Sequence, residues 1–256
     1  VWVTICTSRT DLLDRVLKRR PRGRFVEPGV RWVPAGAWHA ERWLPRQQAR
    51  FVDLQELILA DTGQGVWQRA AAIRAAAGVP EVGRALVLRH VDAAEVVIAE
   101  AALGALVWTD RPDEALPVLL RYADGDRARV ALYSAARAAR HVRPSLLPGV
   151  LGEVLTGPAK ITSRKEAARL LARHGPPQVM AGLLDAYTDP QAHRDLRAAI
   201  VSAARQRLQT EPSWTILRLA VKGSREDRRA VLNVSPYTIP QRHRPGYAAL
   251  IVEACR

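Results

Sequence analysis

The sequence predicts an all-α fold in which pairs of helices repeat along the chain as an α-solenoid. Three observations lead to this class: the composition, the spacing of the prolines and the periodicity of the apolar residues. Apolar residues make up 48% of the 256 positions, yet only two are Phe and Ala is abundant, which favours closely packed helices over a β-sandwich. No stretch after residue 44 alternates with the period of two that a half-buried strand requires.

Prolines mark the repeat. Seven of the seventeen prolines are separated by 32 to 35 residues: Pro45, Pro80, Pro112, Pro144, Pro177, Pro212 and Pro245. A period of this length is typical of solenoid repeats, and a helix tolerates proline in its first turn. We therefore expect the first helix of each unit to begin near one of these prolines.

An apolar helical stripe follows each proline, as Leu116, Leu119 and Leu120 do after Pro112. Offsets of three and four residues place such side chains on one face of an α-helix. A polar turn and a second, Ala-rich helix come next. We expect second helices over 65–77, 92–107, 127–141, 163–174, 193–208 and 225–233, and so about five to six helix pairs.

Two of these second helices, "DLRAAIVSAARQRL" and "RKEAARLLARHG", resemble those of HEAT repeats, including the HEAT-like units of phycobilin lyases. The resemblance extends from Pro45 to Arg256. It implies a right-handed α-α superhelix that binds other proteins. Armadillo repeats are the alternative, but they usually add a third short helix that this period does not easily hold.

The first 44 residues depart from the repeat and are expected to form a separate segment. A helix over 11–20 is followed by a Pro- and Gly-rich stretch with three tryptophans, Trp32, Trp38 and Trp43, for which we expect a loop with a short hairpin near 24–33. At the other end, the helix after Pro245 carries Leu250, Ile251 and Val252 with no second helix to cover them. Solenoid ends need polar caps, so we expect an internal segment of a longer array.

The net charge of +14 is concentrated near the N-terminus. Residues 1–50 hold eleven Lys or Arg against four Asp or Glu, which gives +7. A candidate basic patch consists of Lys18, Arg19, Arg20, Arg22 and Arg24. We interpret it as a helix C-terminus, where cations are stabilised by the helix dipole, followed by a solvated loop; a phosphate-contacting patch is the alternative.

Arginines also recur in the second helices. One ladder, with spacings of 33 and 34 residues, contains Arg140, Arg173 and Arg207; another, with spacings of 33 and 32, contains Arg164, Arg197 and Arg229. Residues one repeat apart stack along a solenoid, and the HEAT resemblance implies that second helices line its concave face. With Arg129 and Arg137, these residues form a candidate surface for an acidic partner. The alternative is that they pair with carboxylates or helix ends of the neighbouring unit.

Other functional classes have weaker support. The sequence contains no nucleotide-binding motif and no motif of a catalytic nucleophile. Cys6 and Cys255 suggest neither a disulfide scaffold nor a zinc site. We interpret His141 and His174 as residues that end helices. The HEAT-like alkylpurine DNA glycosylases use aromatic residues and a carboxylate, for which Trp67, Trp108 with Asp110, and Trp214 are the only counterparts. No apolar run is long enough to span a bilayer.

We therefore expect a cytoplasmic, non-enzymatic scaffold without cofactor or metal, which binds an acidic protein. The alternative is a nucleic-acid-binding protein that uses the arginine ladders.

Overall fold

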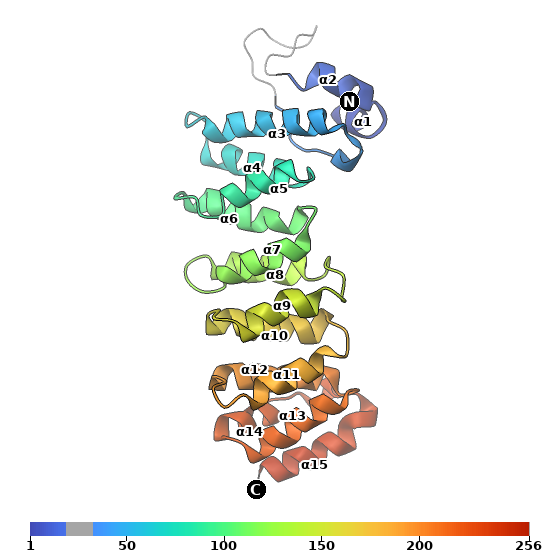
Figure 1. Ribbon diagram of the computed structural model, residues 1–256, viewed down its shortest axis with the longest axis vertical. Coiled ribbons are helices and arrows are strands. Elements are labelled where there is room, and N and C mark those ends of the chain that lie inside the picture. Colours follow the sequence, from blue (N-terminus) through green and yellow to red (C-terminus); the bar gives the residue numbers. More distant parts are fainter. Residues whose placement is uncertain (19–32, 256) are drawn as a thin grey trace. The chain divides into compact units, whose positions relative to one another are not determined.

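The computed structural model describes residues 1–18 and 33–255. Over these ranges every regular element is a helix and no strand is present (Figure 1). The chain divides into two compact units, described separately below: unit 1 comprises Val1–Ala115 and Arg129–Ala138, and unit 2 comprises Leu116–Ala128 and Ala139–Arg256.

Helices occur where the proline spacing predicts them. The successive pairs are α3 (Pro45–Ala60) and α4 (Val66–Ala77), α5 (Val82–Arg89) and α6 (Val96–Ala105), α7 (Pro112–Arg121) and α8 (Ala128–Ala138), α9 (Leu147–Thr156) and α10 (Ile161–His174), α11 (Val179–Thr188) and α12 (Arg194–Ala204), and α13 (Glu211–Lys222) and α14 (Arg225–Leu232). Helix α15 (Arg244–Ala254) contains the seventh proline, Pro245, in its first turn. The predicted all-α class is confirmed for the described ranges.

Some of these helices begin at a proline, and others begin a few residues after one. Pro45 and Pro112 are the first residues of α3 and α7, where a missing N–H costs no hydrogen bond. Pro80 lies two residues before the start of α5. The residue between them, Glu81, has a φ of 56° and is therefore not helical. The Glu81 amide donates a 3.1 Å hydrogen bond to Asp110 Oδ2, which holds this turn.

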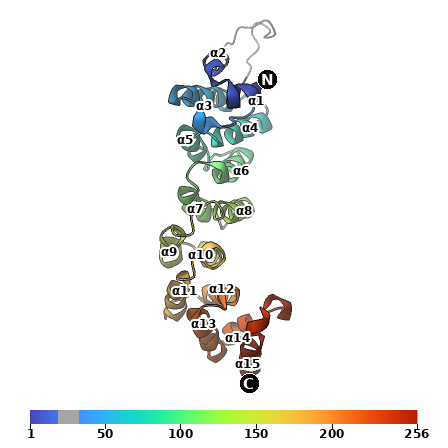
Figure 2. The same cartoon turned by 90° about the vertical axis from the view of Figure 1, so that its right-hand side faces the viewer.

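Unit 1 contains a double row of helices. The first helices α3 and α5 pack against each other, as do the second helices α4 and α6 (Figure 2). A Cβ on Gly83 would lie 2.0 Å from the carbonyl oxygen of Ala76, so α5 approaches α4 more closely than any other residue would permit.

The described part of residues 1–44 packs onto α3. It contains α1 (Trp2–Ser8), α2 (Leu13–Val16) and the short 3-10 helices η1 (Thr10–Leu12) and η2 (Ala40–Arg42). The Trp43 ring lies edge-on to Trp2 and to Phe51 of α3, with centroids 6.1 and 5.6 Å apart, and its indole nitrogen donates a 3.1 Å bond to the Cys6 carbonyl. The compact units therefore do not divide at residue 44. The expected hairpin lies almost wholly at 19–32, outside the described residues.

Unit 2 repeats the double row. Helices α9, α11, α13 and α15 contact one another in sequence order, and α10, α12 and α14 form the second row (Figure 2). Leu250 is buried, with 5% of its surface exposed, whereas Val252 is 56% exposed. The expectation that both lack cover is wrong for Leu250, because α15 packs this face against α13 and α14.

Three-residue 3-10 helices complete the structure: η3 (Leu106–Trp108) and η4 (Arg205–Arg207) extend α6 and α12, and η5 (Pro236–Thr238) and η6 (Gln241–His243) precede α15. None of the helices within 1–18 and 33–255 has both the length and the apolar character needed to cross a membrane.

Candidate anion-binding surface

Two arginines of the predicted surface connect neighbouring helices of unit 2. Arg164, in the first turn of α10, donates a 2.7 Å hydrogen bond from Nε to the carbonyl of Leu155 near the end of α9. Arg197 Nε lies 3.8 Å from a carboxylate oxygen of Asp227, which is buried in the first turn of α14. Arg197 thus shows the alternative pairing with a neighbouring unit, whereas Arg164 bonds to the first helix of its own unit.

Arg207, at the end of η4, also contacts a neighbouring helix. Its Nη2 donates a 2.7 Å hydrogen bond to the carbonyl of Gly175, and its Nε donates to the carbonyl of Ala172. The last carbonyls of an α-helix have no partners within the helix, and a cation is favoured at this end. Arg207 therefore caps α10 from the following repeat.

Arg137 lies in unit 1 and contacts aromatic rings. Its guanidinium carbon is 4.7 Å from the centroid of the Trp108 ring and 5.6 Å from that of Tyr133. Both distances lie within the range of cation–π contacts. Trp108 is 56% exposed and Tyr133 is 65% exposed. The two rings and the Arg137 guanidinium are therefore accessible to a binding partner.

The remaining four predicted arginines, Arg129, Arg140, Arg173 and Arg229, are exposed. None of the ion pairs or side-chain hydrogen bonds among the described residues involves them. Arg140 and Arg173 differ from the other two because their positive charges act on His174, the last residue of α10. Arg207 acts on it as well, so all three arginines of one predicted ladder influence the same histidine.

His174 is the residue around which these arginines gather. Its pKa is lowered by burial first, and then by the positive charges of Arg173, Arg140 and Arg207. Its Nε2 atom is shielded from solvent and has no hydrogen-bond partner in the described part of the chain. Folded proteins rarely leave a buried polar atom unpaired, so this site combines concentrated positive charge with an unused polar atom. We call Arg140, Arg173, Arg207 and His174 the arginine cluster.

The arginine cluster lies in the more basic part of the molecule. Unit 2 contains 21 Lys or Arg and eleven Asp or Glu, a net charge of +10, whereas unit 1 carries the remaining +4. No carboxylate contributes to the pKa shift of His174. Guanidinium groups bind oxyanions through paired, charge-assisted hydrogen bonds, so the chemistry open to this cluster is anion binding.

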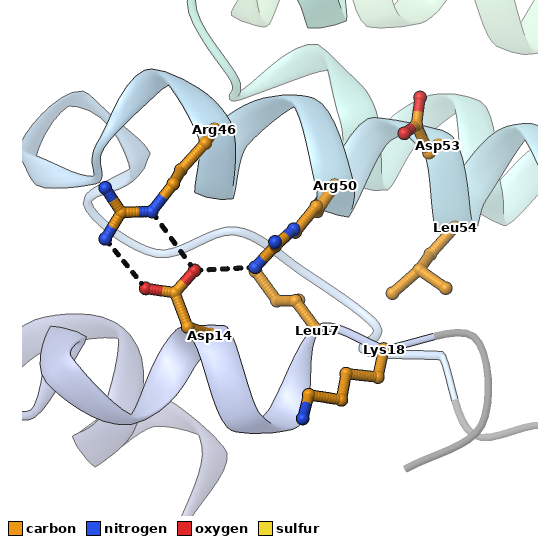
Figure 3. Close-up of a pocket in the computed structure, with 7 residues that line it drawn as sticks. All are labelled: Asp14, Leu17, Lys18, Arg46, Arg50, Asp53 and Leu54. Atoms are coloured by element: carbon orange, nitrogen blue, oxygen red, sulfur yellow. Dashed lines mark hydrogen bonds and ion pairs between the residues drawn. The ribbon is translucent and has the colours of Figure 1, made fainter.

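The predicted N-terminal basic patch is described only at Lys18; Arg19, Arg20, Arg22 and Arg24 lie outside the described residues. Lys18 lines a cavity of about 580 Å³ in unit 1 (Figure 3). The other lining residues are Asp14, Leu17, Arg46, Arg50, Asp53 and Leu54.

The arginines of this cavity are already paired. Asp14 accepts hydrogen bonds of 3.0 Å from Arg46 and 2.7 Å from Arg50 (Figure 3). It accepts a third, of 3.1 Å, from Gln47. These partners, Arg46 foremost, hold the pKa of the Asp14 carboxyl below its usual value. The cavity therefore offers an incoming anion less uncompensated charge than the arginine cluster does.

The residues compared with a glycosylase site have structural contacts of their own. Asp110 pairs with Arg84 at 3.2 Å in addition to accepting the Glu81 amide, and the Trp214 indole donates a 2.7 Å bond to the carbonyl of Leu208. Among residues 1–18 and 33–255, no group of three or more His, Cys, Asp and Glu side chains is placed to hold a metal ion.

Sequence reasoning missed the role of His174 as the centre of the cluster. The available signal was the dipeptide Arg-His, which occurs at 140–141 and again at 173–174, one repeat apart. The 33 residues between these two dipeptides indicate that they end second helices of neighbouring repeats. The spacing does not show that Nε2 of His174 is buried.

Comparisons of the chain with protein-family models, with curated proteins and with solved structures found no match. The functional inference therefore rests on the residues and their geometry.

Proposed function

We propose that this chain is a right-handed, HEAT-like α-solenoid that acts as a non-enzymatic scaffold and binds an acidic protein partner. The repeat of helix pairs supports this proposal, as does the packing of first helices on first helices and of second helices on second helices within each unit. Arginines that join successive second helices add support: Arg69 of α4 pairs at 2.6 Å with Glu95, the residue that precedes α6, as Arg197 of α12 approaches Asp227 of α14.

The observation that carries the binding function is the exposure of Arg140 and Arg173 without a compensating carboxylate. Surface arginines elsewhere in the described chain are commonly paired, as Arg111 is with Asp113 and Glu114. Uncompensated charge on one face attracts a partner of opposite charge and accelerates association. An acidic protein segment is the partner that this surface fits best.

A binding measurement with matched variants tests the proposal. The probe is a fluorescently labelled Glu-rich peptide, compared with a Gln-rich peptide of equal length. We expect the chain to bind only the acidic peptide, with affinity that falls as salt rises. The double variant Arg140→Gln/Arg173→Gln should lose binding.

The control is Lys222→Gln/Arg225→Gln, which removes the same charge from two other exposed residues of unit 2 that form no ion pair within the described part of the chain. It should retain binding. Absence of acidic-peptide binding, or an equal loss in both double variants, would contradict the proposal.

A nucleic-acid-binding function is the second candidate, and the exposed rings of Trp108 and Tyr133 beside Arg137 favour it. Bases stack on exposed aromatic rings, with further attraction from arginine. This candidate predicts that a single-stranded oligonucleotide quenches tryptophan fluorescence and that Trp108→Ala weakens binding. The acidic-protein proposal predicts neither effect.

A further inference from the structure

We infer that the arginine cluster is a phosphate-binding site that recognises a phosphate monoester carried by the protein partner. This inference rests on the proposed function, because it specifies the chemistry of the same partner at the same surface. Three features carry it: a guanidinium that is fixed at the end of α10, two exposed guanidinium groups whose charges act on the same histidine, and a buried imidazole nitrogen with no partner among the described residues.

Arg207 provides the fixed guanidinium. Two of its three nitrogens are bonded to the last turn of α10, Nη2 to Gly175 and Nε to Ala172. The third nitrogen, Nη1, takes part in neither bond. A cation that is already ordered loses little conformational freedom when a ligand binds, so Arg207 is preorganised to contact an anion at the end of α10.

Arg140 and Arg173 supply the other positive charges from two different elements. Arg140 lies just after α8, and Arg173 is the penultimate residue of α10. Both side chains are exposed and have no ion pair or hydrogen bond in the described ranges. With Arg207 from η4, three parts of unit 2 thus carry the arginines whose positive charges act on His174.

His174 adds a polar atom to these charges. Its buried Nε2 has no hydrogen-bond partner in the part of the chain that the structure describes, so the protonation of this imidazole depends mainly on burial and on the charges around it. The three neighbouring cations disfavour a positive charge on the free imidazole. A bound anion would offset them, so ligand binding should make the protonated imidazole more favourable.

The number of charges points to a phosphate monoester. Three guanidinium groups exceed what one carboxylate can balance, whereas a phosphate monoester carries a charge of about −1.5 to −2 and three acceptor oxygens. Clusters of arginine are a recurring means of binding phosphorylated side chains. The phosphodiesters of a nucleic acid would instead favour a continuous track of free cations, and Arg164 and Arg197 of the parallel ladder are engaged with Leu155 and Asp227.

The test uses the full chain and three labelled peptides that differ at one position, which is phosphoserine, serine or glutamate. We expect the phosphoserine peptide to bind at least about tenfold more tightly than the other two and to be displaced by inorganic phosphate. Arg140→Gln/Arg173→Gln should weaken its binding by about tenfold for each lost guanidinium. The control Lys222→Gln/Arg225→Gln should stay within about twofold of the unaltered chain.

A second variant keeps the test informative if the glutamine variant folds poorly. Arg140→Lys/Arg173→Lys retains both charges but loses the forked donors, so we expect an intermediate loss of affinity. Equal affinity for the phosphoserine and glutamate peptides would overturn the phosphate site while leaving the proposed function intact. Failure of every peptide to bind would overturn both. A single-stranded oligonucleotide that binds more tightly than the phosphopeptide, and loses affinity in the same variant, would assign the cluster to nucleic acid and also overturn the inference.

Discussion

Arg207 caps a helix of the preceding repeat: its Nη2 atom donates a 2.7 Å hydrogen bond to the carbonyl of Gly175, just beyond the end of α10. A second bond, from Nε, reaches the carbonyl of Ala172. Arg140 and Arg173, its counterparts in the ladder, remain exposed. Arginines with the same spacing in the sequence therefore have different roles in the structure.

Replacing Arg207 with alanine should destabilise unit 2. The change leaves two carbonyls of the α10 terminus without their donor, and a charge-assisted hydrogen bond contributes roughly 1.5–3 kcal/mol. We expect the free energy of unfolding, measured in urea, to fall by about 1–3 kcal/mol. Arg229→Ala is the matched control because Arg229 is exposed and forms no ion pair or side-chain hydrogen bond with the residues that the structure describes. It should change stability by at most a few tenths of a kcal/mol. Equal effects of the two changes would show that the cap does not contribute.

Trp43→Ala should strongly destabilise unit 1. Trp43 is 4% exposed and joins α1 to α3 through its contacts with Trp2, Cys6 and Phe51. Truncating a buried aromatic side chain of this size costs about 3–5 kcal/mol. Trp67→Ala serves as control, since Trp67 is 69% exposed. If the urea midpoint moved equally for both variants, residues 1–18 would not be packed on α3 as described.

Alkaline pH should weaken unit 2 through Tyr187. Burial, followed by the negative charge of Asp227, raises the pKa of Tyr187 to about 12, above the value near 10 of an unfolded chain. A raised pKa gives stability that is complete below pH 10 and is lost as the pH rises through 10 towards 12. A difference of two pKa units corresponds to about 2.7 kcal/mol.

This effect can be measured as the free energy of unfolding across that pH window. Tyr187→Phe should flatten the dependence, whereas Tyr237→Phe, at a residue that is 91% exposed, should leave it unchanged. An unaltered alkaline profile in Tyr187→Phe would contradict the burial of that hydroxyl in an environment that disfavours its ionisation.

Much of the fold could be predicted from the sequence because the repeat is local. A proline near the first turn and an apolar stripe at helical spacing define each first helix within about fifteen residues, and the expected second helix over 163–174 agrees with α10 to within two residues. The contacts of the N-terminal segment were not predictable in this way. Trp43 donates a hydrogen bond to the carbonyl of Cys6, which lies 37 residues earlier in the sequence. No local sequence pattern predicts a contact between residues so far apart.

The residues of the candidate site could be predicted from the sequence, but the contacts and the burial of their side chains could not. A spacing of 33 residues predicts that Arg140, Arg173 and Arg207 lie one repeat apart, but it does not determine whether a guanidinium faces a carbonyl or the solvent. That choice depends on the distance between neighbouring helix ends. The burial of Nε2 of His174 likewise depends on how the end of α10 is packed, which the sequence periodicity does not describe.

Acidic pH should weaken unit 2 through His174. Its lowered pKa means that the folded state favours the neutral imidazole. The resulting stability is complete above the unfolded pKa of about 6.5 and is lost as the pH falls through the folded value. His174→Gln should reduce this dependence. Unfolding free energies measured from pH 7 downward check this expectation.

Whether the arginine cluster binds a phosphate group can be tested by measuring the pKa of the His174 imidazole by NMR with and without sulfate. Sulfate imitates a phosphate dianion and does not change its own charge over this pH range. We expect a His174 pKa below 6.5 in the free chain, a rise of this pKa when sulfate saturates the site, and a much smaller rise in Arg140→Gln/Arg173→Gln. A His174 pKa that is the same with and without saturating sulfate would contradict the claim that the arginine cluster binds a phosphate group.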